Sequence, residues 1–336
     1  MAALIALSSA LATLLLATLV RRIALARALV DLPGPRRSHS APTPRGGGLA
    51  IVFVVVTAGL CLEATSGWQS NGLVSVLIAL ALTAAVGLAD DLRSLPPLPR
   101  LLVHVGAALL LVAGLLSGSG PPWWFWWGLP LGVAVVALIN IWNFMDGIDG
   151  LAASQALVIA LALAIVPGLA VEAPAWRGLA LVVAAACAGF LVWNLPPARL
   201  FLGDVGSGSL GLVIAGLLGY AVLREGMSLP LAMLLPSAFL TDASLTLGGR
   251  MLRGERWWQP HRQHLYQWAV RAGRGHGVIS LSFLAWTVVM IGLARTLTES
   301  PASTRWTWLF GVYGAAAIIW AILVGQLREQ ARRREA

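Results

Sequence analysis

The sequence predicts an all-α polytopic membrane protein with about eleven transmembrane helices. Hydrophobic residues make up 58% of the 336 residues and charged residues only 11%, far below the roughly 25% charged of a soluble domain. The apolar runs are about 17 to 22 residues long, near the ~20 residues that a helix needs to cross about 30 Å of hydrocarbon. We expect spans at residues 2–20, 46–63, 72–89, 101–117, 124–141, 151–168, 178–194, 207–223, 229–247, 276–297 and 305–327.

The sequence leaves open whether the chain has ten or eleven spans. The segment PPWWFWWGLP at 121–130 is typical of both a loop and a membrane interface, so ten spans are the alternative to eleven. The first run has no charged segment before it and no clear cleavage site, which favours a retained span over a signal peptide. We therefore expect a single membrane domain over residues 1–327 and a short basic cytoplasmic tail at 328–336.

Arginine alone orients the expected helices, because the chain contains no Lys. With the N-terminus outside, 19 of the 23 Arg fall in inner loops, and the positive-inside rule then places the C-terminus in the cytoplasm. Most of the net charge of +9 faces the same side. We interpret most of these arginines as residues that set the topology and contact anionic lipid headgroups. No nucleic-acid partner is expected. Cys61 and Cys187 fall inside expected spans without metal-ligand spacing, so we interpret them as small apolar residues.

The acidic residues are distributed unevenly. All seven Asp lie in or next to expected cytoplasmic segments, whereas the outer loops contain only Glu. Topology does not require this asymmetry, because acidic residues contribute little to orientation. Five cytoplasmic loops hold the chemically unusual residues: RRSHSAPTPRGGG (36–48), GLADDLRSLPPLPR (87–100), NIWNFMDGIDG (140–150), LFLGDVGSG (200–208) and PHRQHLYQWAVRAG (260–273).

Each of these loops precedes a helix that is expected to run outward. The helix N-terminus, with its free N–H groups and positive dipole end, then faces the cytoplasm and favours phosphate binding. Asp146 and Asp149 lie three residues apart and would share one helical face. Hard oxygen ligands beside phosphate favour Mg²⁺, or Mn²⁺ in its place, and Mg²⁺ usually keeps several waters. The pattern predicts phosphoryl transfer at the membrane surface on the cytoplasmic face.

Several of these residues also have structural interpretations. An Asp beside Gly, such as Asp204, is as typical of a turn or a helix N-cap as of a ligand. Adjacent Asp90 and Asp91 favour function, because like charges at a membrane boundary repel unless a cation is present. Asp242 either pairs with Arg250 or Arg253 or belongs to the site. His104 and His276 have no polar company in the sequence and are interpreted as structural.

Four motifs of the sequence are GLADDLRSLPPLPRL, NIWNFMDGIDGLAA, WNLPPARLFLGDVGSGSLG and HRQHLYQ. They resemble the signatures of the polyprenyl-phosphate N-acetylhexosamine-1-phosphate transferases of glycosyltransferase family 4. HSAPTPRGGGLA resembles the family's first-loop signature, so the resemblance spans residues 36 to about 273. It implies an enzyme of the bacterial inner membrane in which undecaprenyl phosphate attacks the β-phosphorus of a UDP-N-acetylsugar. The products are UMP and a lipid-linked sugar pyrophosphate, and Mg²⁺ is required. A homodimer is one assembly that the sequence leaves open.

The resemblance also implies roles for individual residues. Asp204 and Asn143 match positions that hold Mg²⁺, Asn140 supports their loop, and Asp90 with Asp91 matches the pair proposed to bind or deprotonate the lipid phosphate. The remaining matches are expected on the substrate side. Asp146 and Asp149 correspond to the nucleotide side of the pocket, Arg100 to a phosphate-binding cation, and His261, Arg262 and His264 to the loop that contacts the sugar phosphate.

The last loop departs from the common bacterial pattern of the N-acetylglucosamine branch. His261 stands where that pattern has Asp, and Tyr266 stands in place of a His. This resembles the branch that initiates O-antigen or related surface polysaccharides, and it predicts that His261 and Tyr266 select the sugar. The sequence leaves the identity of the sugar open.

Two other classes share part of the pattern. Intramembrane acids and Gly-broken helices also mark ion-coupled transporters, but these acids gather at one face and no inverted repeat is visible. The CDP-alcohol phosphotransferases use Asp and Gly near the membrane too. Their Asp-Gly-x-x-Ala-Arg pattern fails at DGIDGLAA, which contains no Arg.

Overall fold

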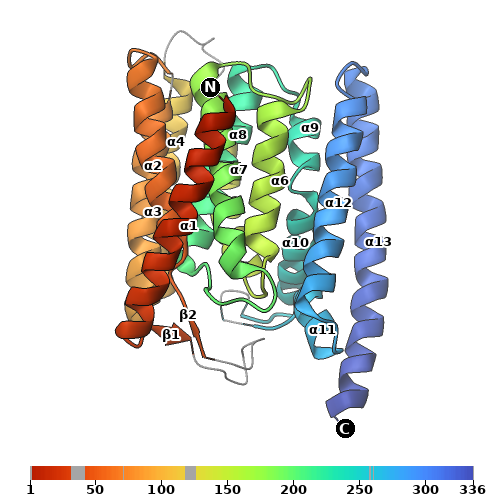
Figure 1. Cartoon of the computed structure of the whole chain (residues 1–336). Coiled ribbons are helices and arrows are strands. Elements are labelled where there is room, and N and C mark those ends of the chain that lie inside the picture. Colours follow the sequence, from red (N-terminus) through yellow and green to blue (C-terminus); the bar gives the residue numbers. More distant parts are fainter. Residues whose placement is uncertain are drawn as a thin grey trace.

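The computed structural model describes residues 2–31, 42–70, 72–117, 126–256, 259 and 261–335, and shows a bundle of helices with one short β ladder (Figure 1). The first helices are α1 (Ala2–Ala26), α2 (Gly48–Thr65), α3 (Leu73–Arg93), α4 (Pro97–Leu116), α5 (Gly128–Met145), α6 (Leu151–Ile165) and α7 (Pro174–Asn194). They are followed by α8 (Asp204–Arg224), α9 (Leu229–Leu234), α10 (Ser237–Leu252), α11 (Leu265–Arg271), α12 (His276–Thr296) and α13 (Ala302–Glu335).

Within the described residues, nine helices are long and apolar enough to cross a membrane, which makes this a multi-pass membrane protein. They are α1 to α5, α7, α8, α12 and α13. The expected span at 151–168 is a shorter apolar helix of 15 residues, α6. The number of crossings and the orientation stay predictions, and residues 118–125, including the first half of PPWWFWWGLP, lie outside the described part of the chain.

The prediction of one continuous span over 229–247 is wrong. The chain forms the short helix α9, and a second helix, α10, begins at Ser237. Pro236 stands between them, and proline supplies no N–H to a helix and clashes with the carbonyl four residues earlier. The broken span lets α10 extend to Leu252, beyond the expected end of the span at 247.

Helix α8 is the centre of the bundle and packs against α2, α3, α5 and α6. Its residues from Val205 to Ala221 are all buried. Small residues permit this close approach: a Cβ added to Gly206 would lie 2.7 Å from the Cα of Gly48 on α2, and one added to Gly211 would lie 2.4 Å from the carbonyl of Leu138 on α5. The first residue of α8, Asp204, is thereby fixed relative to three other helices.

A two-stranded ladder ties the first loop to the start of α8. Strand β1 (Val30–Asp31) pairs antiparallel with β2 (Thr43–Pro44). The N–H of Phe201 donates to the carbonyl of Pro44, and the N–H of Gly47 donates back to the carbonyl of Phe201, both at 2.9 Å. The ladder and α11 lie at the same end of the bundle (Figure 1), so loops distant in sequence meet there.

Helix α13 is unbroken from the apolar part of the bundle to its basic end, and residues 328–335 continue it. Near that end α13 packs against α11. The ring of Trp268 on α11 lies under two guanidinium groups, that of Arg271 at 4.2 Å and that of Arg328 at 5.0 Å from the ring centroid. Cation–π contacts of this kind join the last helix to the loop that precedes α12.

Candidate active site at one end of the bundle

A cavity of about 400 Å³ opens where the loops before α2, α6, α8 and α12 meet. It contains carboxylates from three different loops. Its lining consists of Asp31, Arg45, Asp91, Asp146, Gly147, Ile148, Asp149, Asn194, Phe201, Leu202, Gly203, Asp204, Gln267 and His276. Four of the predicted site residues, Asp91, Asp146, Asp149 and Asp204, therefore face one shared space.

Asp204 is joined to the last turn of α5. The side-chain Nδ2 of Asn143 donates to Oδ1 of Asp204 at 2.6 Å and lies 3.0 Å from the Ser207 hydroxyl. The backbone turns into α8 at Gly203, whose φ of +77° is a conformation that glycine adopts freely. The predicted metal-binding pair is thus assembled from two helices that end and begin at the same level.

Arg100 lies between two of the predicted site carboxylates, those of Asp90 and Asp204. Its Nη1 lies 2.5 Å from Oδ2 of Asp90 and 3.9 Å from Oδ2 of Asp204, and its Nη2 donates to Oδ1 of Asn143 at 3.4 Å. Asp90 also accepts the N–H of Leu95 at 2.5 Å. Asp90 is buried. The ion pair and the hydrogen bond offset the cost of removing its carboxylate from water.

Asp91 holds the N-terminus of α8. Its two carboxylate oxygens accept the backbone N–H groups of Asp204, at 3.1 Å, and Val205, at 3.0 Å. A negative charge at this position satisfies free donors and complements the helix dipole. A Cβ on Gly203 would lie 2.6 Å from Oδ2 of Asp91, so only glycine leaves room for this cap. A guanidinium nitrogen of Arg45 donates to the backbone carbonyl of Asp91.

The second acidic pair, Asp146 and Asp149, lines the same cavity. Burial, together with the negative charges of Asp204, Asp91 and Asp149, raises the pKa of Asp146 well above its usual value. Oδ2 of Asp149 accepts the N–H of Ala198 at 3.1 Å and lies 3.2 Å from Nδ1 of His276.

The interpretation of His276 as a residue without polar company is wrong. His276 lines the cavity and contacts Asp149, because the chain returns to the site at the start of α12. His104 is buried on α4, one turn after Arg100, and its Nδ1 has no hydrogen-bond partner within the described residues, which agrees with its interpretation as structural. Sequence spacing hides the contact of His276, since its partner lies 127 residues earlier in the chain.

The loop before α11 is packed against the end of α5. Tyr266 is 1% exposed, and its hydroxyl donates to the carbonyl of Phe144 at 2.8 Å. The expected sugar contact of Tyr266 does not fit this geometry, because the hydroxyl also accepts from Gln267 at 3.1 Å. The ring of His264 lies between those of Phe144 and Tyr266, with centroid distances of 6.2 and 5.8 Å.

Asp242 on α10 holds the start of helix α11 by hydrogen bonds. Its Oδ1 accepts the N–H of Leu265 at 2.8 Å and the indole N–H of Trp320 on α13 at 2.9 Å, and lies 3.8 Å from Nδ1 of His264. The expected pairing of Asp242 with Arg250 or Arg253 is not formed. Both of those arginines contact Glu255 instead, at 2.7 and 2.6 Å.

Other predicted residues lie outside the cavity lining. Asp90, Arg100 and Asn143 form the layer behind Asp204. Asn140 donates its side-chain N–H to the carbonyl of Val136 on its own helix at 2.7 Å. His261, Arg262 and His264 lie just before helix α11. This loop together with α11 (residues 261–271), called the α11 loop below, contributes Gln267 to the lining. Burial, with the nearby His264 and Arg250, lowers the pKa of His261 to about 4, so this ring is neutral at physiological pH.

The site offers oxygen donors of the kind that Mg²⁺ binds. Within the described residues, no three His, Cys, Asp or Glu side chains are placed to hold a metal ion by themselves. The oxygens of Asp204, Asn143 and Asp146 suit Mg²⁺ chemically, because this ion is bound through one or two carboxylates and completes its shell with water and phosphate oxygens.

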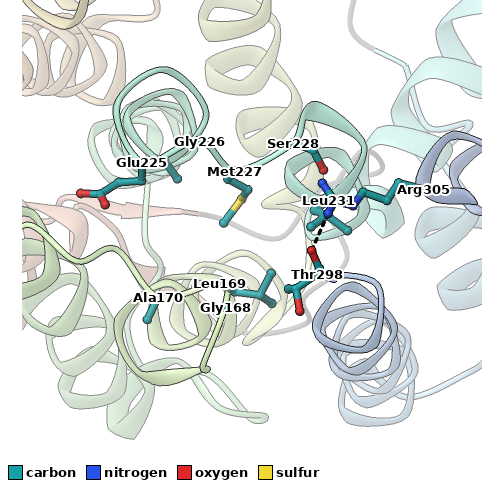
Figure 2. A pocket seen from close by; sticks show the side chains of 11 residues that line it. Gly168, Leu169, Ala170, Glu225, Gly226, Met227, Ser228, Leu231, Thr298 and Arg305 are labelled. Carbon is teal, nitrogen blue, oxygen red and sulfur yellow. Dashed lines mark hydrogen bonds between the residues drawn. The ribbon is translucent and has the colours of Figure 1, made fainter. Parts of the chain in front are cut away.

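A second, smaller cavity of about 160 Å³ lies at the other end of the bundle, where α8 and α9 approach the loop between α12 and α13 (Figure 2). Glu225 and Arg305 contribute its charges. The guanidinium of Arg305 is held by backbone carbonyls, donating through Nε to Leu297 at 3.1 Å and through Nη2 to Thr298 at 2.5 Å. With one carboxylate and an arginine bonded to the backbone, this cavity lacks the acidic cluster of the first.

The acidic cavity at one end of this bundle of membrane helices, with Arg45 in its lining, has the groups that phosphate chemistry at a membrane requires, and the comparisons show the family. The profile described as "Glycosyl transferase family 4" matches residues 73–221. A decaprenyl-phosphate N-acetylglucosaminephosphotransferase of Mycolicibacterium smegmatis is 30% identical over 94% of this chain and 87% of its own length. The chain belongs to glycosyltransferase family 4, among its polyprenyl-phosphate hexosamine-1-phosphate transferases.

Other relatives cover two branches of that family. A probable undecaprenyl-phosphate N-acetylglucosaminyl 1-phosphate transferase of Bacillus subtilis is 28% identical over 90% of this chain and 85% of its own length. A phospho-N-acetylmuramoyl-pentapeptide-transferase of a Synechococcus strain is 36% identical, but over only 55% of this chain and 58% of its own length. Similarity along nearly the whole chain therefore lies with proteins named for N-acetylglucosamine.

Proposed function

We propose that this protein transfers an N-acetylhexosamine-1-phosphate from a UDP-sugar to undecaprenyl phosphate, with release of UMP. The observation that carries the proposal is the junction of α5 and α8, where Asn143, Asp204 and Arg100 converge within hydrogen-bonding or ion-pair distance. Oxygen ligands and a guanidinium at a helix N-terminus are the groups that a pyrophosphate and its metal ion require.

The reaction exchanges one phosphorus–oxygen bond for another. An oxygen of the lipid phosphate bonds to the β-phosphorus of the UDP-sugar, and the bond from that phosphorus to the bridging oxygen breaks, which leaves UMP. A phosphate monoester loses its second proton near pH ~6, so a strong protein base is unnecessary. When bound, Mg²⁺ would neutralise charge that develops on the pyrophosphate.

Residues of this chain then have distinct tasks. Asp204 and Asn143, with Asp146 opposite, would hold the metal ion, and Arg45 on the cavity wall would attract phosphate. Asp90 is engaged by Arg100 and by the N–H of Leu95, which suits it to orient Arg100 rather than to take a proton. Asp91, as the cap of α8, would fix the position of Asp204.

We further propose that the reaction is the first membrane step of O-antigen or another cell-envelope polysaccharide, on the cytoplasmic face of a bacterial inner membrane. The relatives named for N-acetylglucosamine make UDP-N-acetylglucosamine the first donor to test. A transporter has no support among the comparisons, because the matched relatives are transferases along most of the chain.

Purified protein in detergent, undecaprenyl phosphate and a panel of UDP-sugars provide the direct test. We expect UMP release with at least one UDP-N-acetylhexosamine in the presence of Mg²⁺, and none with UDP-glucose or without the lipid phosphate. Asp204→Ala is the matched control for background hydrolysis. Failure of every UDP-sugar to release UMP from folded protein would reject the proposed donor class.

The orientation can be tested independently of activity. After Cys61 and Cys187 are replaced by Ala, single cysteines at Ser94 and Gly275 should react with an impermeant maleimide only from the cytoplasmic side. A cysteine at Glu172, at the other end of the bundle, should react only from outside. Labelling of Ser94→Cys and Gly275→Cys from opposite sides would separate the two loops that the proposed site requires to be together.

A further inference from the structure

Two arginines share one tryptophan at the edge of the bundle, away from the acidic cavity. The guanidinium of Arg21, near the end of α1, lies 5.1 Å from the ring centroid of Trp193 on α7, and that of Arg199 lies 5.3 Å from the same centroid. Nε of Arg21 also donates to the backbone carbonyl of Arg199 at 3.2 Å. We call these three residues the Arg–Trp–Arg cluster.

The cluster lies at the level where the lipid-facing surface ends. Large apolar side chains are exposed on both of its helices: Leu19 and Ile23 on α1 are 52% and 45% exposed, and Val192 on α7 is 51% exposed. Such a surface is stable only against lipid tails. The polar loops that line the acidic cavity follow directly, so the two guanidinium groups lie at the level of the phosphate groups of one leaflet.

The two arginines of the cluster have no acidic partner among the described residues. In the part of the chain that the structure describes, no Asp or Glu forms an ion pair with Arg21 or Arg199. Two guanidinium groups beside one ring repel each other, and a shared anion removes that repulsion. Arginine binds phosphate through paired hydrogen bonds from its planar guanidinium group. The indole ring of Trp193 holds both guanidinium groups in place through cation–π contacts.

We propose that the Arg–Trp–Arg cluster binds the phosphate of an anionic phospholipid from the leaflet next to the acidic cavity. The apolar surface of α1 and α7 would contact the acyl chains, and the arginines the phosphate. This interaction is separate from the transferred sugar phosphate and from the lipid acceptor, and it concerns a lipid that remains bound as part of the protein's surroundings.

The cluster is connected to the acidic cavity through one loop. The N–H groups of Arg199 and Leu200 donate to the carbonyl of Trp193 at 2.8 and 3.2 Å. Within the same loop, Asn194 donates to the carbonyl of Leu200 at 3.0 Å and accepts the N–H of Gly150 at the same distance. A lipid bound at Arg199 therefore steadies the segment that leads into Asp204.

The test uses the full-length protein in a neutral detergent, with phosphatidylglycerol as the probe and phosphatidylcholine as the neutral lipid. We expect phosphatidylglycerol to raise the Tm and to remain bound in native mass spectrometry, with little effect of phosphatidylcholine or inorganic phosphate. The double variant Arg21→Gln, Arg199→Gln should bind phosphatidylglycerol at least about tenfold more weakly, the effect expected from losing charge-assisted hydrogen bonds. Arg22→Gln, the exposed neighbour on α1, is the matched control and should behave as wild type.

Three results would overturn the proposal. They are an unchanged phosphatidylglycerol response in the double variant, an equal response to phosphatidylcholine, and an equal loss in Arg22→Gln. Should the double variant fail to fold, the single variant Arg199→Gln, which removes an exposed side chain, gives the same comparison by native mass spectrometry. The measurements need no substrate, so they stay informative even if the proposed transferase reaction is not found.

Discussion

The amide of Asn143 and the carboxylate of Asp204 are 2.6 Å apart, and this contact joins the last turn of α5 to the first turn of α8. The contact uses only one oxygen of Asp204, since the other faces Arg100 at 3.9 Å. Arg100 thus provides a positive charge beside the ligands that we assign to the metal ion. A metal ion or a phosphate arriving at this position would meet a preformed arrangement of ligands rather than separate side chains.

Replacing Asp204 by Ala should abolish most of the activity while leaving the fold intact. Loss of a metal ligand removes several kcal/mol of charge stabilisation, so we expect kcat/KM to fall by at least about 100-fold. UMP release at saturating Mg²⁺ measures the effect, and the unfolding temperature shows whether the protein is folded. Ser207→Ala, which removes the second acceptor of the Asn143 side-chain N–H group, should cost much less. Turnover by Asp204→Ala in excess EDTA would remove the metal ion from the mechanism.

Asp91 and Asp90 should differ in what they contribute. Asp91→Ala removes the acceptor for two N–H groups of α8, and loss of such a cap costs about 1 to 2 kcal/mol of stability. The unfolding temperature of Asp91→Ala should therefore drop together with its activity. Asp90→Asn keeps an acceptor for Leu95 and should mainly weaken binding of Arg100 and reduce turnover. Equal stability of Asp91→Ala and wild type would contradict the capping role.

Metal binding should depend on pH through Asp146. Its raised pKa means that the folded protein holds a proton that the unfolded chain has already lost. Stability from this proton is complete below the usual carboxyl pKa and is lost as pH rises through the raised pKa. In EDTA we expect the Tm to fall as pH rises through the raised pKa, and Mg²⁺ should restore it increasingly at higher pH, because binding displaces the proton. Thermal unfolding of wild type and Asp146→Asn at several pH values provides the test, and the variant should lack this trend in EDTA.

His276 should matter for catalysis despite its position at the start of a membrane helix. Its Nδ1 lies 3.2 Å from Asp149, so His276→Ala frees a carboxylate that lines the cavity. Asp149 keeps the N–H of Ala198 but loses the imidazole. Loss of one partner of a buried polar group costs about 1 to 3 kcal/mol, and we expect a fall in kcat/KM of roughly 5- to 150-fold. His104→Ala, on α4, is a comparison variant whose loss should appear in stability. An unchanged kcat/KM in His276→Ala would return this residue to a structural role.

Tyr266 and His261 should separate stability from sugar selection. Tyr266→Phe removes the hydrogen bond to Phe144, which should lower stability by about 1 kcal/mol without changing the ratio of kcat/KM among UDP-sugars. His261, which is only partly buried, remains the candidate for selection, and His261→Asp should change that ratio. The two variants are compared on the same UDP-sugar panel. A changed ratio in Tyr266→Phe would show that its hydroxyl reaches the sugar after all.

Much of the fold follows from local sequence properties. In the described part of the chain, long apolar runs determine where the nine long membrane helices form, because a spanning helix must match the thickness of the bilayer. The gathering of Asp91, Asp146, Asp149 and Asp204 in one cavity also agrees with the sequence, since all four lie in loops expected on one side. Hydropathy over 229–247 could not show the break between α9 and α10, because Pro236 does not reduce the apolar character of that segment.

Side-chain partners were less accessible to sequence reasoning. Asp91 shows this most clearly: both of its oxygens accept N–H groups of the first turn of α8, while its role at the lipid phosphate stays a prediction. The partner is 113 residues away in the chain, and nothing in the sequence near Asp91 specifies it. The same limit applies to Asp242, whose partner Trp320 lies on α13. Hydrophobic period and loop position predict which end of a helix a residue occupies, but not which neighbour it contacts.

The unbroken course of α13 has a mechanical consequence. A helix that is too long for the hydrocarbon layer tilts, and the tilt changes with the thickness of the membrane. Because α13 carries Trp320 against Asp242 and Arg328 against Trp268, a change in its tilt would displace both ends of the α11 loop. Membranes of different thickness would therefore alter how closely that loop approaches the acidic cavity, even when every substrate is supplied at the same concentration.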